Sequence, residues 1–160
     1  MISIDVELPT TPDAQELLAQ SAALSAALYP PESCHIASAD ALSGHNALFF
    51  MARSNGRAIA CGALVIGEEY GEIKPMFVDA SVRGQGVGRK LLEAIEARAR
   101  FEGLNVLRLE TGIHNREAVA LYFRHGYERR AAFGAYGPDP LSIFMEKRLA
   151  PLSGLNLRHM

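Results

Sequence analysis

The chain opens with alternating apolar and polar residues and continues with apolar residues at helical spacing. Residues 2–8 alternate isoleucine, valine and leucine with polar side chains, which predicts a half-buried strand. Thr11 and Pro12 follow as a helix cap and a first-turn proline. Leucines and alanines then recur at helical spacing until Tyr29 and Pro30. An amphipathic helix of roughly four or five turns is expected here.

The middle of the chain has the pattern of a hairpin and a third strand. Two apolar runs, 47–53 and 58–66, are separated by Ser54-Asn55-Gly56, and Asn-Gly between apolar runs strongly indicates a tight turn. A further apolar stretch at 70–79 predicts the next strand. The residues between the first helix and Asn46 show no regular period and are expected to be irregular.

Helical and strand patterns alternate in the second half. We expect helices from about Val87 to Gly103 and from Asn115 to His125, and strands at 104–111, 127–133 and 142–148. The predicted order is β-α-β-β-β-α-β-α-β-β, without a repeat or an interdomain linker. This order indicates one α/β domain around a mixed sheet over residues 1–148. A tail at 149–160 shows no clear period.

Composition narrows the classes of function. The net charge of −2 and a pI near 6.2 disfavour nucleic acid or an anionic membrane as the main partner. Two cysteines are too few for a disulfide framework, and the five histidines lack metal-ligand spacing, so no metal is expected. No apolar run approaches the length of a membrane span, and the N-terminus lacks a signal-peptide pattern. The expectation is a soluble cytoplasmic protein.

A glycine-rich turn precedes the second long helix. Gly84, Gly86 and Gly88 leave backbone amides accessible at a helix N-terminus, an arrangement that favours phosphate. A tight turn without a ligand is the alternative. The P-loop pattern fails, because Arg89 follows Gly88 where Lys-Ser/Thr is required. The dinucleotide pattern is weakened by the spacing but stays open, since Glu110 ends the next strand where a ribose-binding acid could lie.

Arg83-x-x-Gly86-x-Gly88 resembles the pyrophosphate-binding motif of the GNAT family of N-acetyltransferases. Residues 72–79 resemble that family's fourth strand, and the stretch from Asn115 to Tyr127 resembles its later Asn…Ala…Leu-Tyr…Gly-aromatic pattern. The resemblance implies a mixed, mostly antiparallel sheet flanked by helices, the acyl-CoA N-acyltransferase fold. A proline within the fourth strand, at position 75, departs from the common pattern and predicts an unpaired position or a bulge.

The resemblance also implies acetyl-CoA as cosubstrate and assigns roles to individual residues. Val78 would stabilise the carbonyl oxygen through its main-chain N–H, and Tyr122 would act as general acid. Glu72 lies six residues before Val78, so on a regular strand both would face one side and Glu72 would serve as base. The expected coenzyme-binding residues are Phe77, Val78, Arg83, Gly84, Gln85, Gly86, Val87, Gly88, Arg89, Asn115 and Tyr122.

The acceptor is expected to be a primary amine of a small molecule or an amino acid. The candidates for holding it are His35, Arg53, Lys74, His114 and Tyr136. Arg53 or Lys74 could pair with a substrate carboxylate, which favours an amino acid. The alternatives are an acyltransferase for protein amines, a coenzyme A-binding regulatory module without turnover, and a nucleotide-binding regulator. Since members of this family are often dimers, a homodimer is a further expectation.

Overall fold

The computed structural model describes residues 1–35 and 38–150. The strands are β1 (Ile2–Val6), β2 (Ala47–Ser54), β3 (Arg57–Ile66), β4 (Gly71–Val78), β5 (Val106–Gly112), β6 (Glu128–Arg130) and β7 (Ser142–Arg148). The helices are α1 (Pro12–Leu28), α2 (Ala39–Leu42), α3 (Val87–Phe101) and α4 (Arg116–Arg124), with 3-10 turns at Pro31–Ser33 and Ala80–Val82. The predicted order of strands and long helices is confirmed, and α2 adds one turn in the segment expected to be irregular. Most of the expected tail lies outside the described residues.

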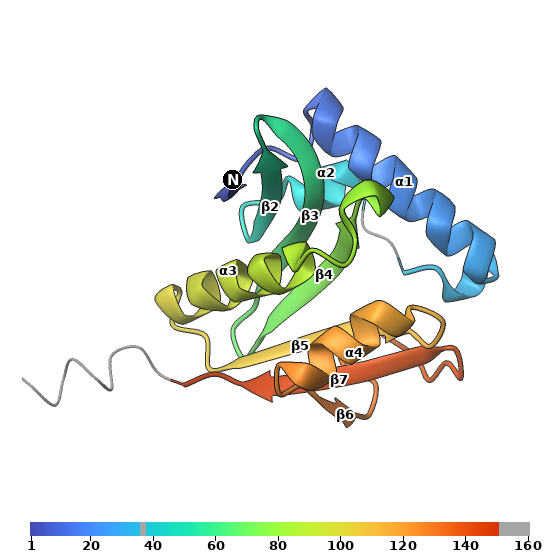
Figure 1. Cartoon of the computed structure of the whole chain (residues 1–160). Coiled ribbons are helices and arrows are strands. Elements are labelled where there is room, and N and C mark those ends of the chain that lie inside the picture. Colours follow the sequence, from blue (N-terminus) through green and yellow to red (C-terminus); the bar gives the residue numbers. More distant parts are fainter. Residues whose placement is uncertain (36–37, 151–160) are drawn as a thin grey trace, which may run out of the picture.

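The strands form one sheet in the order β1-β2-β3-β4-β5-β7-β6 (Figure 1). Its neighbours are antiparallel except for β4 and β5, which are parallel and joined through α3. These two strands pair only where residues 71–73 lie beside residues 107–109. Beyond that point they diverge, and the middle of the sheet opens at their C-terminal ends (Figure 1).

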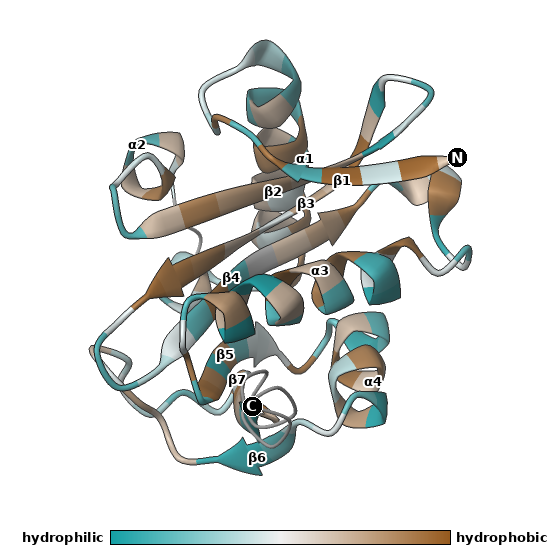
Figure 2. Ribbon diagram, turned by 90° about the vertical axis from the view of Figure 1, so that its left-hand side faces the viewer, coloured by the Kyte–Doolittle hydropathy of each residue, from teal (hydrophilic) through white to brown (hydrophobic). Residues whose placement is uncertain are grey.

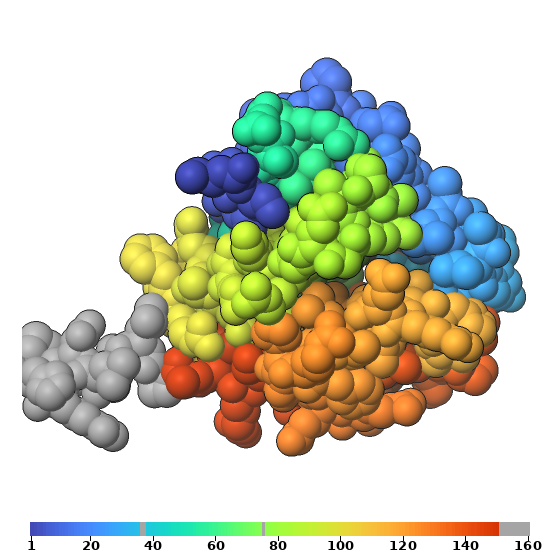
Figure 3. Space-filling view, viewed as in Figure 1, coloured from blue at the N-terminus to red at the C-terminus, as the bar shows by residue number. Residues whose placement is uncertain are grey.

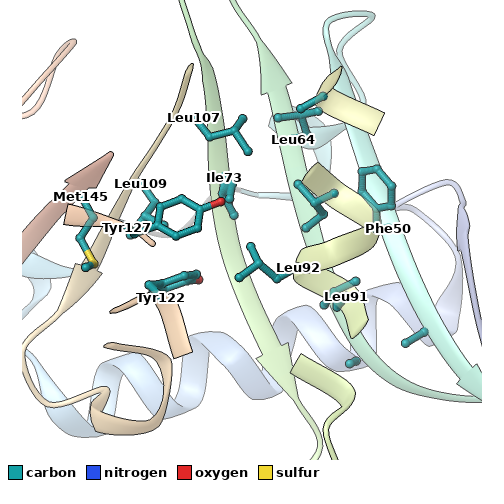
Figure 4. Packing of buried hydrophobic residues seen from close by; sticks show 14 of the residues in the cluster. Phe50, Leu64, Ile73, Leu91, Leu92, Leu107, Leu109, Tyr122, Tyr127 and Met145 are labelled. Atoms are coloured by element: carbon teal, nitrogen blue, oxygen red, sulfur yellow. The ribbon is translucent and has the colours of Figure 1, made fainter. Parts of the chain in front are cut away.

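Helices cover both faces of the sheet. Residues of α3 and α4 pack on one face in a large cluster that includes Leu91, Leu92, Leu107, Tyr122 and Met145 (Figure 4). A smaller cluster joins α1 and α2 to the other face. The strands β2 and β3 between these layers are mostly hydrophobic, whereas the edge strand β6 is mostly hydrophilic (Figure 2). In the described part of the chain, no helix is long and apolar enough to cross a membrane.

The predicted start of α1 is confirmed. Thr11 has extended backbone angles, and its Oγ1 accepts a hydrogen bond from the amide of Ala14 at 3.2 Å. Pro12 is the first helical residue, where its missing N–H costs no hydrogen bond. The helix then buries one stripe consisting of Ala14, Leu17, Leu18 and Ser21.

Replacing Thr11 by alanine is expected to lower the free energy of unfolding by about 1 kcal/mol, because the amide of Ala14 loses its partner. Urea denaturation of the purified protein measures this difference. Thr10→Ala is the matched control, since Thr10 contributes only its carbonyl, which accepts from Gln15. Equal stabilities of the two variants would contradict the capping role.

The hairpin between β2 and β3 turns as predicted. Asn55 and Gly56 both have positive φ, at 50° and 83°, which is the geometry that an Asn-Gly turn supplies. The first strand is shorter than expected, however. It ends at Val6, and Leu8 is 69% exposed, so the alternation over 2–8 overestimated both its length and its burial.

A bulge in β4 corrects the expected orientation of Glu72. Lys74 lies opposite Ala63 and Phe77 opposite Cys61, so two residues of β4 face the single Gly62 of β3. The bulge predicted around position 75 is therefore confirmed. It shifts the alternation by one residue and places Glu72 and Val78 on opposite faces of the sheet. The two were expected to share a face, and that expectation is wrong.

Candidate active site

A single large pocket occupies the opening between β4 and β5. Its volume is about 980 Å³, near the upper end for a small-molecule site. The pocket passes through the layer of the sheet, so α3 and α4 line one end and α1 with the loop before β7 lines the other. A hollow between the start of α3 and α4 is visible on the surface (Figure 3). The two ends of the pocket therefore meet between the diverging strands.

The glycine-rich turn forms the wall at the α3 end. Gly84 and Gly86 have positive φ, at 80° and 78°, and the first turn of α3 receives no side-chain cap. Its amides therefore lack intrahelical partners and carry the positive end of the helix dipole. Gly88 lies against Leu121 of α4, where an added Cβ would come within 3.3 Å of Cδ2. A turn of this geometry can receive an anion such as pyrophosphate.

Arg83 connects this turn with the end of β4. Its Nε donates to the carbonyl of Val78 at 3.0 Å, and its guanidinium lies 5.7 Å from the ring centre of Phe77. Arg83, Phe77 and Val78 line the pocket, as do the turn residues 84 and 86–89, but Gln85 does not. The structure thus brings together every expected coenzyme-binding residue except Gln85.

The amide of Val78 points into the opening. The neighbouring amide of Asp79 donates to the carbonyl of Ile59 on β3 at 2.8 Å, and Val78 lies opposite Ala60. Amides of successive residues in a strand point to opposite sides, so that of Val78 is directed away from β3. It faces the side from which β5 has diverged. A backbone donor in this position can stabilise charge that develops on a carbonyl oxygen.

Tyr122 lies at the floor of the pocket and is only 4% exposed. Its ring packs against Tyr127 with centres 5.6 Å apart (Figure 4). Tyr127 is held in turn, because its hydroxyl donates to buried Glu96 at 2.7 Å, which also contacts Lys147 at 3.0 Å. Burial, and then the charge of Glu110, raise the pKa of Tyr122. The phenol therefore keeps its proton at neutral pH.

Asn115 occupies the N-cap position of α4, yet its side chain does not cap the helix. Its Nδ2 reaches Thr111 Oγ1 at 3.4 Å, and both residues line the pocket. The amide group of Asn115 is thus oriented toward the pocket from the same wall as Tyr122. It can supply a hydrogen bond to an extended ligand that crosses the opening.

Glu110 is the carboxylate that the sequence interpretation did not assign to catalysis. It lines the pocket from the diverging end of β5 and accepts a hydrogen bond from Ser142 Oγ at 2.7 Å. Burial raises its pKa, although the bond from Ser142 opposes the shift. A carboxyl group with a raised pKa in a pocket is a candidate acid or base. The sequence signal for Glu110 is an acidic residue at the end of a strand, a position that by itself indicates a ribose contact and no catalytic role.

Glu72 lies behind the pocket wall. Its Oε2 accepts a hydrogen bond from Tyr136 at 2.6 Å and forms an ion pair with Lys74 at 3.1 Å. Lys74 also donates to the hydroxyl of Tyr136 at 3.0 Å. Lys74 and Tyr136 line the pocket, whereas Glu72 does not. This triad shapes the wall at the α1 end.

Two histidines complete the same end. His35 packs edge-on against Tyr136 and lies 3.8 Å from a carboxylate oxygen of Asp139. His114 stacks on the ring of Tyr29, and its amide donates to the Tyr29 hydroxyl at 3.0 Å. Four of the five expected substrate-binding residues therefore lie together.

Arg53 is the exception and corrects the prediction. Its guanidinium binds Glu7 at 2.8 Å and Asp13 at 2.9 Å, and it does not line the pocket. The pairing of β1 with β2 brings Arg53 beside the start of α1. Arg53 thus joins secondary-structure elements and is not available to a substrate carboxylate.

The amide-lined turn, the inward Val78 amide and the continuous pocket fit a coenzyme with a pyrophosphate and a long arm. A model of the acetyltransferase (GNAT) family matches residues 14–127, which is more than half of the chain. A protein of Azospirillum brasilense named "IAA acetyltransferase" is 48% identical over 124 residues, covering 76% of this chain and 81% of that protein.

Solved structures of acyltransferases are also similar to this chain. A proposed acyl-CoA N-acyltransferase of Klebsiella pneumoniae superposes with a TM-score of 0.80 at 41% identity, over 94% of this chain and 99% of that one. A GNAT family acetyltransferase of Elizabethkingia anophelis, solved with acetyl-CoA bound, has a TM-score of 0.68 at 20% identity over 92% and 98%. The latter likeness shows the fold alone.

Proposed function

Because the chain belongs to the acetyltransferase (GNAT) family of acetyl-CoA-dependent acyltransferases, we propose that it acetylates a primary amine of a small molecule by direct attack. The observation that carries this proposal is the pocket through the sheet. At one end it has free amides and arginine, which suit a pyrophosphate, and at the other it has a carboxylate, which suits an ammonium group. The two ends meet beside the Val78 amide.

In this proposal, different residues of the chain act as base, as acid, as stabiliser of the carbonyl oxygen and as coenzyme-binding groups. When bound, acetyl-CoA supplies the acetyl group as a thioester. Glu110 accepts a proton from the incoming ammonium, which frees the nitrogen lone pair. The Val78 amide stabilises negative charge on the carbonyl oxygen, and the Tyr122 hydroxyl gives its proton to the departing sulfur as the C–N bond forms and the C–S bond breaks. The second proton of the nitrogen passes to solvent, and Tyr122 regains its proton from solvent. The amides of 84–88, with Arg89 and Asn115, hold the coenzyme.

We assign the base to Glu110 in preference to Glu72. Glu72 is separated from the pocket by Tyr136 and Lys74, both of which bind its Oε2. A base within hydrogen-bond reach of the amine, or one water away, must line the pocket, and Glu110 does so. We propose that Glu72 orients Lys74 and Tyr136. A cytoplasmic location and a homodimer stay predictions from the sequence.

Direct calorimetric titration tests the proposed function. Acetyl-CoA and coenzyme A are expected to bind saturably, NAD and ATP to bind at least about tenfold more weakly, and thiol release to follow when amines are added. Tight binding of NAD or ATP without acetyl-CoA binding would overturn the assignment. Saturable acetyl-CoA binding without thiol release from any amine would favour a regulatory module.

Two glycines with the same strained geometry make a matched pair for this titration. Gly86 at φ 78° lies in the anion-binding turn, and Gly103 at φ 82° follows the far end of α3. An alanine at either position costs similar backbone strain. Gly86→Ala is expected to weaken acetyl-CoA binding about tenfold through displaced amides, and Gly103→Ala to leave it unchanged. Equal effects would contradict the anion-binding role.

A further inference from the structure

The charges at the α1 end of the pocket are mostly negative and the cations there are already bound. Glu110 lines this end of the pocket. Asp139 and Glu72 do not line it, but they lie next to two residues that do, His35 and Lys74. Hydrogen bonds from the amide of Leu141 and from Ser33 lower the pKa of Asp139, so it is ionised at neutral pH. The ammonium of Lys74 contacts Glu72 at 3.1 Å and the hydroxyl of Tyr136 at 3.0 Å.

The arginines that line the pocket lie at its other end. The arginines of the pocket, at positions 83, 89, 116 and 124, come from the turn before α3, from α3 and from α4, which is the coenzyme end. His35 faces Asp139 at 3.8 Å, so a positive charge on this imidazole would already be paired. Lys74 and His35 of the α1 end thus each lie beside a carboxylate, whereas the ring of His114 stacks on Tyr29.

An apolar wall lines the same end of the pocket as Glu110. Leu24 and Leu28 of α1 line the pocket although they are 41% and 38% exposed. They lie outside the stripe by which α1 packs on the sheet, which is formed by residues 14, 17, 18 and 21. Large exposed leucines on a pocket wall offer a surface for apolar groups of a ligand. Tyr29, at the end of the same helix, extends this wall toward β5.

We propose that the acceptor is a primary amine on an apolar body without a carboxylate, such as an arylalkylamine or alkylamine, and not the corresponding amino acid. The inference rests on the proposed function and narrows its substrate class. The ammonium of such a molecule would lie at Glu110, and its hydrocarbon part would lie on Leu24 and Leu28. A carboxylate next to the amine would face Glu110, and the carboxylates of Glu72 and Asp139 already lie beside Lys74 and His35, so binding would include like-charge repulsion.

The proposal can be tested with pairs of substrates, each consisting of an amine and the amino acid that differs from it only by a carboxylate. With acetyl-CoA saturating, we expect kcat/KM for tryptamine and 2-phenylethylamine to exceed that for tryptophan and phenylalanine by at least about tenfold. Calorimetry on the protein saturated with coenzyme A, where no acetyl group is available, should give the same order of affinity. Equal or better use of the amino acids, in either measurement, would overturn the inference.

The binding measurement separates this inference from the proposed function. If the amines bind in preference to the amino acids but are never acetylated, the substrate-class inference stands and the proposed catalytic function fails. If amino acids are acetylated preferentially, the function stands and the inference fails. Binding of neither class to the coenzyme-loaded protein would overturn the inference as well.

The apolar wall has its own test. Replacing both Leu24 and Leu28 by alanine is expected to lower kcat/KM for hexylamine about three- to tenfold, and that for ethylamine much less, because only the longer chain reaches the leucines. Phe101→Ala is the control, since Phe101 is 75% exposed on α3 and does not line the pocket. A uniform loss for both amines would contradict contact between the wall and the hydrocarbon chain.

Discussion

Replacing Tyr122 by phenylalanine is expected to lower kcat about 10²–10³-fold while leaving the affinity for acetyl-CoA within about threefold of its original value. In the proposed mechanism the hydroxyl of Tyr122 protonates the leaving sulfur, and phenylalanine removes only that group. The ring is fixed by its contact with Tyr127 and stays in place in the variant. Because the raised pKa of Tyr122 keeps it protonated, the whole enzyme population carries this proton at assay pH.

Thiol-release kinetics measure kcat, and calorimetry measures coenzyme affinity for the same preparation. Tyr70→Phe is the matched control, because Tyr70 packs on Phe133 outside the pocket and loses the same hydroxyl. Unchanged turnover in Tyr122→Phe would dismiss the proton-donor role. A loss of coenzyme binding equal to the loss of turnover would instead make Tyr122 a binding residue.

Replacing Glu110 by glutamine is expected to lower kcat/KM about 10²–10³-fold at neutral pH, because the amide cannot accept the proton of the acceptor ammonium. The pH profile supplies a second readout. In the unmodified enzyme, activity rises with pH as Glu110 ionises, and burial places this rise above the ordinary glutamate pKa of 4.5. The variant should lack this acid limb.

Stability distinguishes a catalytic loss from misfolding in this variant. Because the folded-state pKa of Glu110 is raised, its favourable contribution to stability is present at low pH and is lost as pH rises through the folded pKa. Glutamine avoids the buried charge and can still accept from Ser142. The variant should therefore be at least as stable as the original protein at pH 7, by urea denaturation.

Glu72→Gln is the comparison that decides between the two carboxylates. It removes the ion pair with Lys74, so we expect mainly a raised KM and an acid limb that persists. If Glu72→Gln abolishes the acid limb and Glu110→Gln keeps it, the base assignment is reversed.

The bulge in β4 shows why the sequence misplaced Glu72. Strict alternation put Glu72 and Val78 on one face, and two residues of β4 opposite Gly62 reversed that relation. The proline at position 75 indicated that a bulge was present. It could not indicate where along β4 the alternation would shift, because that position depends on the register in which β4 pairs with β3.

The features of the fold that the sequence determined by itself depend on residues that are near one another in the chain. The order of elements, the Thr11 cap, the Asn-Gly turn and the glycine-rich start of α3 all depend on residues close together in the chain, so their pattern suffices. Motif spacing likewise identified the residues that we propose bind the coenzyme, and all of them except Gln85 line one pocket. These features depend on backbone preference and side-chain period, which act over a few residues.

The acceptor end was decided by the tertiary structure. Glu110 reaches the pocket because β5 diverges from β4 and pairs with β7, which brings Ser142 to its side chain. Arg53 is withdrawn from the site by the pairing of β1 with β2, which places Glu7 and Asp13 beside it. Contacts of this kind join residues 30 to 60 or more positions apart. No local period encodes them, since they arise from strand order and from where the strands separate.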